Sequence, residues 1–122
     1  MYAKQNILIV DDNSQLNTML KTILESENFR IFQAFNGREA FKLAMKENID
    51  LIIMDLLMPQ MNGDAAIEAI YLVNPKIKYI VISGNMNWID KEKLKKLNVV
   101  EFFDKPFDIP VLIESVKKVL LD

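Results

Sequence analysis

Five residues with chemically active side chains each follow an apolar run of this sequence. They are Asp11, Asp12, Asp55, Ser83 and Lys105. Taken singly, each has an ordinary structural explanation: aspartate and serine are common in turns and at helix starts, and a lysine before proline fits a plain loop. Those explanations do not account for their joint occurrence after four separate apolar runs. The set therefore points to one shared site.

Three carboxylates brought together repel one another, so a partly desolvated cleft that holds them needs a cation. Ligands made of oxygen alone favour a hard divalent ion, and a shallow site with room for water suits Mg²⁺ better than Ca²⁺. The segment DDNSQLNTMLKT lacks the central glycine and terminal glutamate of an EF-hand, which excludes that loop. Mg²⁺ beside a lysine and a hydroxyl would stabilise the charge on a phosphoryl group. Asp55 is then the expected nucleophile, because carboxylates form aspartyl phosphates.

The overall composition removes several other classes of function. With 17 acidic and 15 basic residues the formal net charge is -2, which gives no electrostatic footprint for nucleic acid or an anionic membrane. The absence of cysteine and histidine excludes disulfides, thiol nucleophiles, Cys/His zinc sites and histidine-based catalysis. The apolar part of MYAKQNILIV is too short for a signal peptide, and no apolar run reaches the roughly 18 residues of a membrane span. We expect a soluble, cytoplasmic protein with one domain over residues 1–122.

Strands and helices alternate along the chain. Short apolar runs predict strands over Ile7–Val10, Arg30–Phe35, Leu51–Met54, Tyr79–Ile82 and Val99–Phe103. Helical spacing predicts helices from Leu16, over Arg38–Lys46, from Ala66 to before Pro75, over Lys91–Leu97 after an Asp90 cap, and from about Ile109. The segment that begins at Gly84 is loop-like up to Asp90. The expected inward-facing stripes include Leu16, Met19, Leu20, Ile23 and Leu24 in the first helix, and Ala66, Ala69, Ile70 and Val73 in the third.

This alternation predicts an α/β fold, a doubly wound five-stranded parallel sheet with helices on both faces. In such sheets the site lies outside the carboxyl ends of the strands. The acidic pair, the lone aspartate, the serine and the lysine all stand at or just after those ends. The first helix has Asn13 or Ser14 as its N-cap.

Four motifs of the chain resemble those of a two-component response-regulator receiver domain of the CheY-like kind. They are the acidic pair after the first strand, DLLMPQMNG at the third, ISG at the fourth and DKPF at the fifth. The resemblance spans nearly the whole chain, and the combination of motifs is highly specific. It implies the flavodoxin-like (βα)5 fold with strand order 2-1-3-4-5, in which the four strand ends adjoin one crevice.

By matching position, the resemblance implies that Asp55 takes a phosphoryl group from a histidine of a sensor kinase or a histidine phosphotransfer protein. Mg²⁺ would be held directly by Asp12, Asp55 and the backbone carbonyl of Leu57. Asp11 would hold it through water. The resemblance thus implies a magnesium-dependent phosphoprotein of a two-component system, with at most self-phosphorylation and autodephosphorylation as its own catalysis.

The resemblance also implies a switch. Lys105 would contact the phosphoryl group, and Ser83, where threonine is more frequent, would hydrogen-bond it. Phe102 stands at the position of the switch aromatic, usually tyrosine, and its turn inward would change the surface of the fourth helix, fifth strand and fifth helix. The Lys105-Pro106 bond matches one that is usually cis in the family. Asn98 replaces the usual glycine, and asparagine tolerates left-handed backbone geometry.

Three other functions compete with this hypothesis. A nucleotide binder of the flavodoxin kind needs a phosphate-cradling loop, whereas DDNSQ is acidic and free of glycine. A haloacid-dehalogenase-type phosphatase needs a second aspartate where Leu57 stands. A degenerate receiver would act as an interaction module without phosphorylation.

Partners beyond the phosphoryl donor stay open in the sequence. The chain is either a stand-alone messenger or the receiver part of a longer regulator with an output domain, and phosphorylation could drive a homodimer. Met86, Asn87 and Trp88 are candidates for a partner surface, although Trp88 fits equally well as a cover for the edge of the core.

Overall fold

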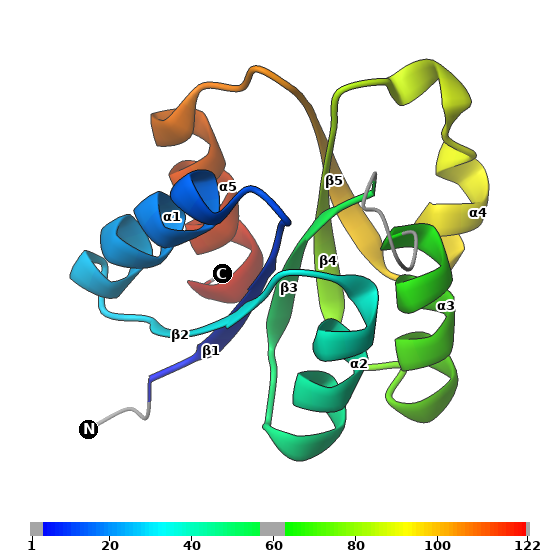
Figure 1. Cartoon of the computed structure of the whole chain (residues 1–122), viewed down its shortest axis with the longest axis horizontal. Helices are drawn as coiled ribbons and strands as arrows, with labels where there is room; N and C mark the ends of the chain where they lie inside the picture. Colours follow the sequence, from blue (N-terminus) through cyan, green and yellow to red (C-terminus); the bar gives the residue numbers. More distant parts are fainter. Residues whose placement is uncertain (1–3, 57–62, 122) are drawn as a thin grey trace.

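The structure is a computed structural model that describes residues 4–56 and 63–121. Within these residues five strands form one parallel sheet in the order β2-β1-β3-β4-β5 (Figure 1). The strands are β1 (Asn6–Val10), β2 (Arg30–Ala34), β3 (Leu51–Asp55), β4 (Lys78–Ser83) and β5 (Val99–Asp104). The predicted α/β fold and the implied strand order are therefore confirmed, and each strand end lies within one residue of its predicted place.

Helices cover both faces of the sheet (Figure 1). They are α1 (Ser14–Ser26), α2 (Gly37–Lys46), α3 (Gly63–Val73), α4 (Lys91–Lys96) and α5 (Ile109–Leu121). Successive side chains of a strand point to opposite faces. Ile7 and Ile9 accordingly pack with residues of α1 and α5, whereas Leu8 and Val10 pack with residues of α2, α3 and α4.

Side-chain caps begin three of the helices, and the sequence predicts those of α1 and α4. The side chain of Asn13 accepts a hydrogen bond from the Leu16 backbone N–H and caps α1, and Asn36 caps α2 through the N–H of Glu39. Asp90 caps α4. The segment before that cap, expected to be loop, contains one short 3₁₀ helix, η1 (Met86–Trp88).

Two apolar positions face differently from the prediction. Met19, expected on the inward stripe of α1, is 40% exposed, and Val73, expected on the inward stripe of α3, is 60% exposed. The side of α1 that packs on the sheet is centred instead on Asn17, Leu20 and Leu24. A polar residue thus occupies part of the buried stripe, which the apolar pattern could not reveal.

The strand register brings the functional residues to one edge of the sheet. Val10 pairs with Met54, Asp55 with Ile82, and Ser83 with Asp104. Since all strands run in the same direction, the residues after β1, β3, β4 and β5 emerge together at the carboxyl edge. Asn98, just before β5, has a φ of 72°, so the left-handed geometry expected there is present.

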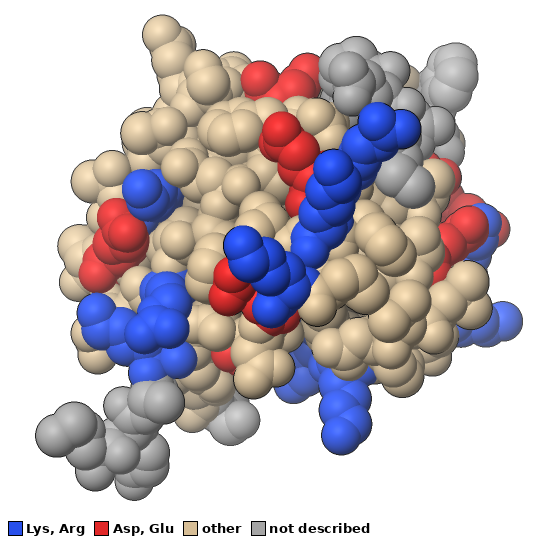
Figure 2. Space-filling model, turned by 60° about the horizontal axis from the view of Figure 1, so that its bottom comes forward, with Lys and Arg blue, Asp and Glu red and all other residues tan. Residues whose placement is uncertain are grey.

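Charges of both signs are interspersed on the face drawn in Figure 2, where basic side chains lie next to acidic ones rather than in one continuous patch. In the part of the chain that the structure describes, no helix is long and apolar enough to cross a membrane.

Candidate functional site

Three carboxylates meet at the carboxyl edge of the sheet. Asp11 directly follows β1 and is 3% exposed, and Asp55 is the last residue of β3 and is 4% exposed. Asp12 lies beside them at the surface. One carboxylate oxygen of each residue lies within 4.8 Å of the other two. Carboxylates this close, two of them buried, repel one another unless positive charge is supplied.

Lys105 supplies one positive charge. Its Nζ lies 3.2 Å from Oδ2 of Asp55 and 3.4 Å from Oδ2 of Asp11. Burial alone would lower the pKa of Lys105, but the negative charges of Asp55 and Asp11 outweigh burial, so the net pKa is raised. The ammonium therefore stays protonated, and this one positive charge faces three carboxyl groups. The excess of carboxyl groups and the oxygen-only donors fit a divalent cation such as Mg²⁺.

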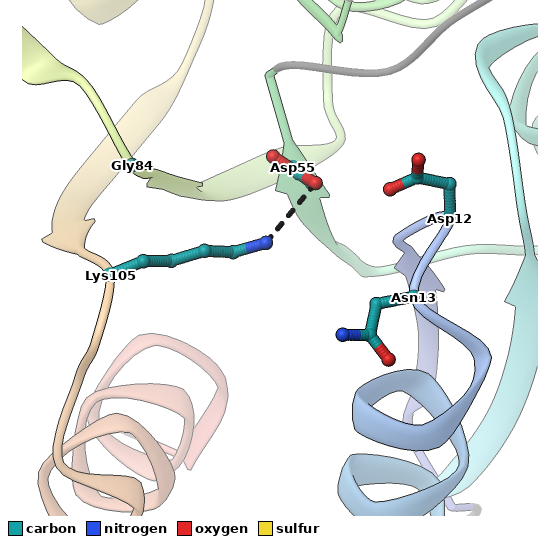
Figure 3. A pocket seen from close by; sticks show the side chains of 5 residues that line it. All are labelled: Asp12, Asn13, Asp55, Gly84 and Lys105. Atoms are coloured by element: carbon teal, nitrogen blue, oxygen red, sulfur yellow. Dashed lines mark hydrogen bonds and ion pairs between the residues drawn. The ribbon is translucent and has the colours of Figure 1, made fainter.

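An open pocket of ≈ 470 Å³ lies among these residues and is lined by Asp12, Asn13, Asp55, Gly84 and Lys105. Figure 3 shows Lys105 reaching from just after β5 toward Asp55, while the Asp12 carboxylate faces Asp55 from the loop between β1 and α1. Polar groups from distant parts of the chain thus converge on one small opening. It has room for a small anion together with a hydrated ion.

Local hydrogen bonds hold the loop between β1 and α1. Oδ1 of Asp11 accepts a hydrogen bond from the backbone N–H of Asn13 at 2.9 Å, and the backbone N–H of Asp11 donates to the carbonyl of Ala34 at 3.2 Å. Asp11 is therefore fixed by β2 and by its own loop, as well as by Lys105. The exposed carboxylate of Asp12 is the one on the solvent side of the cluster.

Ser83 lies at the end of β4 with its side chain fully buried. Its Oγ accepts a hydrogen bond from the backbone N–H of Asn85 at 3.1 Å, and its carbonyl accepts one from the N–H of Lys105 at 2.9 Å. The neighbouring Gly84, rather than Ser83, lines the pocket. In this conformation the Ser83 hydroxyl is thus engaged behind the pocket wall.

Phe102 lies on β5, paired in register with Val81 of β4, and is partly buried. It packs against the core on the face of α2, α3 and α4. The Nζ of Lys91, the first residue of α4, lies 5.4 Å from the centroid of the Phe102 ring, within the range of a cation–π interaction. The Lys105-Pro106 bond is cis.

Leu57, whose carbonyl was expected to bind the metal, lies outside the described residues, as does the side chain of Trp88. Leu56 and Gly63 are the described residues on either side of this segment. The Gly63 N–H donates a hydrogen bond to the Leu56 carbonyl at 3.0 Å. A β-carbon built on Gly63 would lie 2.5 Å from the carbonyl oxygen of Asp55. Gly63 therefore packs directly against the backbone of the acidic strand end.

Sequence reasoning missed two residues that support the site. Gly63 stands at the end of the DLLMPQMNG motif, and nothing in the sequence shows how closely its backbone approaches Asp55. Asn17 was passed over, although it shares one helical face with Leu20 and Leu24 at spacings of three and seven. A polar residue on an apolar stripe was the available signal.

Comparison with known proteins agrees with this geometry. The family model of the response regulator receiver domain matches residues 7–117. The sporulation initiation phosphotransferase F of Bacillus subtilis is 32% identical over 95% of this chain and 94% of that protein. The chemotaxis protein CheY of Thermotoga maritima is 34% identical over 94% of this chain and 97% of that protein.

A solved structure adds a relative with a bound ion. The response regulator protein TrrA of Thermotoga maritima, crystallised in complex with Mg²⁺-BeF, superposes with a TM-score of 0.83 at 32% identity and covers 95% of this chain and 99% of that one. The family model and the relatives span almost the whole sequence. The chain therefore belongs to the family of response regulator receiver domains, which act in two-component signalling.

Proposed function

We propose that Asp55 accepts a phosphoryl group from a phosphohistidine of a sensor histidine kinase or a histidine phosphotransfer protein. The observation that carries the proposal is the position of Asp55 at the base of an acidic cluster, with the Lys105 ammonium 3.2 Å from its Oδ2 atom. Within the described residues this is the carboxylate that lines the pocket and is also buried against a cation.

The transfer proceeds by nucleophilic attack. A lone pair on a carboxylate oxygen of Asp55 forms the new O–P bond, while the P–N bond of the phosphohistidine breaks. The electron pair of that bond returns to the imidazole, which takes up a proton from solvent. The Lys105 ammonium, which pairs with Asp55 in this structure, then contacts the negative oxygens of the transferred phosphoryl group.

The donor set suits Mg²⁺ held by Asp12, Asp55 and the backbone carbonyl of Leu57, with Asp11 acting through water. When bound, the ion neutralises charge on the phosphoryl oxygens. The Mg²⁺-BeF complex of the TrrA relative supports this assignment. In this chain three carboxyl groups lie around the single Lys105 ammonium, and that provides the electrostatic reason for a divalent cation.

The switch proposed for this chain uses Ser83 and Phe102. Contact with the phosphoryl group would draw the Ser83 hydroxyl away from the Asn85 N–H, and the Phe102 ring would then turn inward, away from Lys91. The affected surface is that of α4, β5 and α5. To move the chain from about 1:99 to 99:1, phosphorylation must favour the active form by about 5.5 kcal/mol.

Receiver domains are signalling domains that are generally not classed as enzymes. For this chain we infer that its own catalysis is limited to self-phosphorylation from small donors and autodephosphorylation. Residues 1–122 would act as one receiver unit in the cytoplasm, where ATP-dependent kinases make phosphohistidine.

The test is phosphorylation by acetyl phosphate with Mg²⁺, followed by intact mass measurement. The wild-type chain should gain one acid-labile phosphoryl group, and Asp55→Asn should gain none. Asp64→Asn, which changes an exposed carboxylate in the first turn of α3, is the matched control and should be labelled like the wild type. Equal labelling of Asp55→Asn would refute the acceptor. A wild-type chain that takes no label from acetyl phosphate or a kinase would instead be a degenerate receiver.

A further inference from the structure

Asn17 is the buried polar residue that the proposed chemistry leaves without a role. The buried polar or charged residues of the described chain are Asp11, Asn17, Asp55 and Ser83. The other three belong to the site already described. Asn17 lies in the first turns of α1, fully shielded from solvent, under the loop that carries the acidic pair. A buried amide is unfavourable unless its donors and acceptor are bonded, so its bonds indicate what it holds in place.

The side chain of Asn17 joins the ends of two strands. Its Nδ2 donates to the backbone carbonyl of Asp11 at 3.1 Å and to that of Ala34, the last residue of β2, at 3.0 Å. A third contact, to the Ile9 carbonyl, is longer at 3.5 Å. Its Oδ1 accepts a hydrogen bond from Nε2 of Gln33 at 3.0 Å. Both hydrogens of the amide are thus used on carbonyls at the carboxyl edge of the sheet.

The peptide groups of Asp11 are consequently held on both sides. The N–H of Asp11 donates to the Ala34 carbonyl, and its own carbonyl accepts from Asn17. Because the Asp11 carbonyl belongs to the peptide bond that leads into Asp12, the amide of Asn17 fixes the backbone between the two acids. The orientation of that peptide decides where the Asp12 carboxylate lies relative to Asp55.

We propose that Asn17 is a positioning residue for the cation site: it fixes the Asp11–Asp12 peptide so that both carboxylates stay within reach of Asp55. This inference rests on the proposed function, since it concerns the Mg²⁺ that the acidic cluster would hold. Asn17 touches neither the ion nor the phosphoryl group. Partners of metal ligands typically change metal affinity by about 10-fold to 100-fold when they are removed.

The alternative is that Asn17 serves only the stability of the fold. The two roles separate when Mg²⁺ affinity and the unfolding midpoint are measured on the same variants. Asn17→Leu removes the two donors while keeping a similar volume. Leu24→Ala, two turns along the same helix and equally buried, weakens packing without touching the loop. Gln33→Met removes the bond to Oδ1 and leaves both bonds to the carbonyls intact.

The experiment is calorimetric titration of each variant with Mg²⁺, together with thermal unfolding of the ion-free protein. We expect Asn17→Leu to bind Mg²⁺ about 10-fold more weakly than the wild type. Leu24→Ala should unfold at a lower temperature but bind Mg²⁺ with unchanged affinity. Gln33→Met should keep the wild-type affinity for Mg²⁺. If Asn17→Leu does not fold, Asn17→Ser replaces it, because the smaller hydroxyl leaves room for water. Asn17→Ser should also bind Mg²⁺ more weakly than the wild type.

Wild-type affinity in Asn17→Leu or Asn17→Ser would overturn the positioning role while leaving the proposed function in place. Loss of affinity in Leu24→Ala equal to that in Asn17→Leu would also overturn it, because general loosening would then explain both. A wild-type chain that does not bind Mg²⁺ at all would refute the metal part of the proposed function and this inference with it. The wild-type titration therefore distinguishes the two failures.

Discussion

Nζ of Lys105 lies 3.2 Å from Oδ2 of Asp55, although 50 positions separate the two residues in the chain. The contact spans from the loop after β5 to the end of β3, with β4 between those strands. It pairs the proposed acceptor with the one ammonium of the pocket lining. After transfer, the Lys105 ammonium would also have to contact the phosphoryl group. Because that ammonium lies beside Asp55 and Asp11, it competes with Mg²⁺ for the same carboxylates.

Lys105→Ala is expected to separate ion binding from phosphorylation. Loss of the ammonium leaves the acidic cluster with more negative charge, so Mg²⁺ should bind several-fold more tightly while phosphorylation by acetyl phosphate slows. Calorimetry and labelling rates measure the two effects. Lys118→Ala, an exposed lysine near the end of α5, is the control and should change neither. If Lys105→Ala is labelled at the wild-type rate, the lysine takes no part in phosphoryl transfer.

Asp12→Ala is expected to weaken Mg²⁺ binding by about 10-fold or more, because even the outer partners of metal ligands have effects of that size. The residue is exposed and its removal relieves repulsion with Asp11 and Asp55, so the unfolding midpoint of the ion-free chain should equal or exceed that of the wild type. Asp64→Asn again provides the control. If calorimetry gives an unchanged Mg²⁺ dissociation constant, Asp12 is not a direct ligand of the ion.

Much of this molecule could be predicted from its sequence because parallel α/β folds have a strong signal. Apolar runs such as Leu51–Met54 are buried on both faces, and the residues that follow them emerge at one edge of the sheet. Asp55 and Lys105 could therefore be assigned to a common site before any coordinates were known. The strand order came from the family resemblance, since local patterns do not specify which strands are neighbours.

What the sequence missed depends on contacts between distant backbones. Met19 fits the apolar period of α1, yet the register of α1 on the sheet turns Asn17 inward and Met19 outward. Asn17 donates to the carbonyl of Asp11, just after β1, and to that of Ala34 in β2, a pair that only the folded chain brings together. The engagement of Ser83 with Asn85 is likewise a property of one conformation, and residue types alone do not specify it.

Gly63→Ala is expected to destabilise the chain by about 1–3 kcal/mol, the usual range for overpacking. The new β-carbon would lie 2.5 Å from the Asp55 carbonyl oxygen and 2.7 Å from Cα of Leu56, both of them backbone atoms that cannot turn away. Labelling of Asp55 should also slow, because the acceptor strand end must shift. Gly84→Ala is the matched control for stability, since a β-carbon there meets nothing within 4 Å. Equal denaturation midpoints for the two variants would contradict the close approach.

Tyr79→Phe tests a buried phenol on β4. Tyr79 is fully buried, and its hydroxyl has no hydrogen-bond partner within the described residues. Removal of an unsatisfied buried hydroxyl is close to neutral or stabilising, so the variant should unfold at the wild-type temperature or above at pH 7.

The same phenol should make the wild-type chain sensitive to alkali. Burial raises the pKa of Tyr79 above its usual value near 10, so the folded chain keeps a proton that the unfolded chain releases. The unfolded state then binds fewer protons, and stability falls as the pH rises above about 10. Unfolding midpoints between about pH 8 and 11 should fall less steeply for Tyr79→Phe than for the wild type. Tyr71→Phe, a partly exposed tyrosine of α3, should follow the wild-type curve. Parallel curves for the wild type and Tyr79→Phe would mean that the phenol ionises as readily in the folded chain as in the unfolded one.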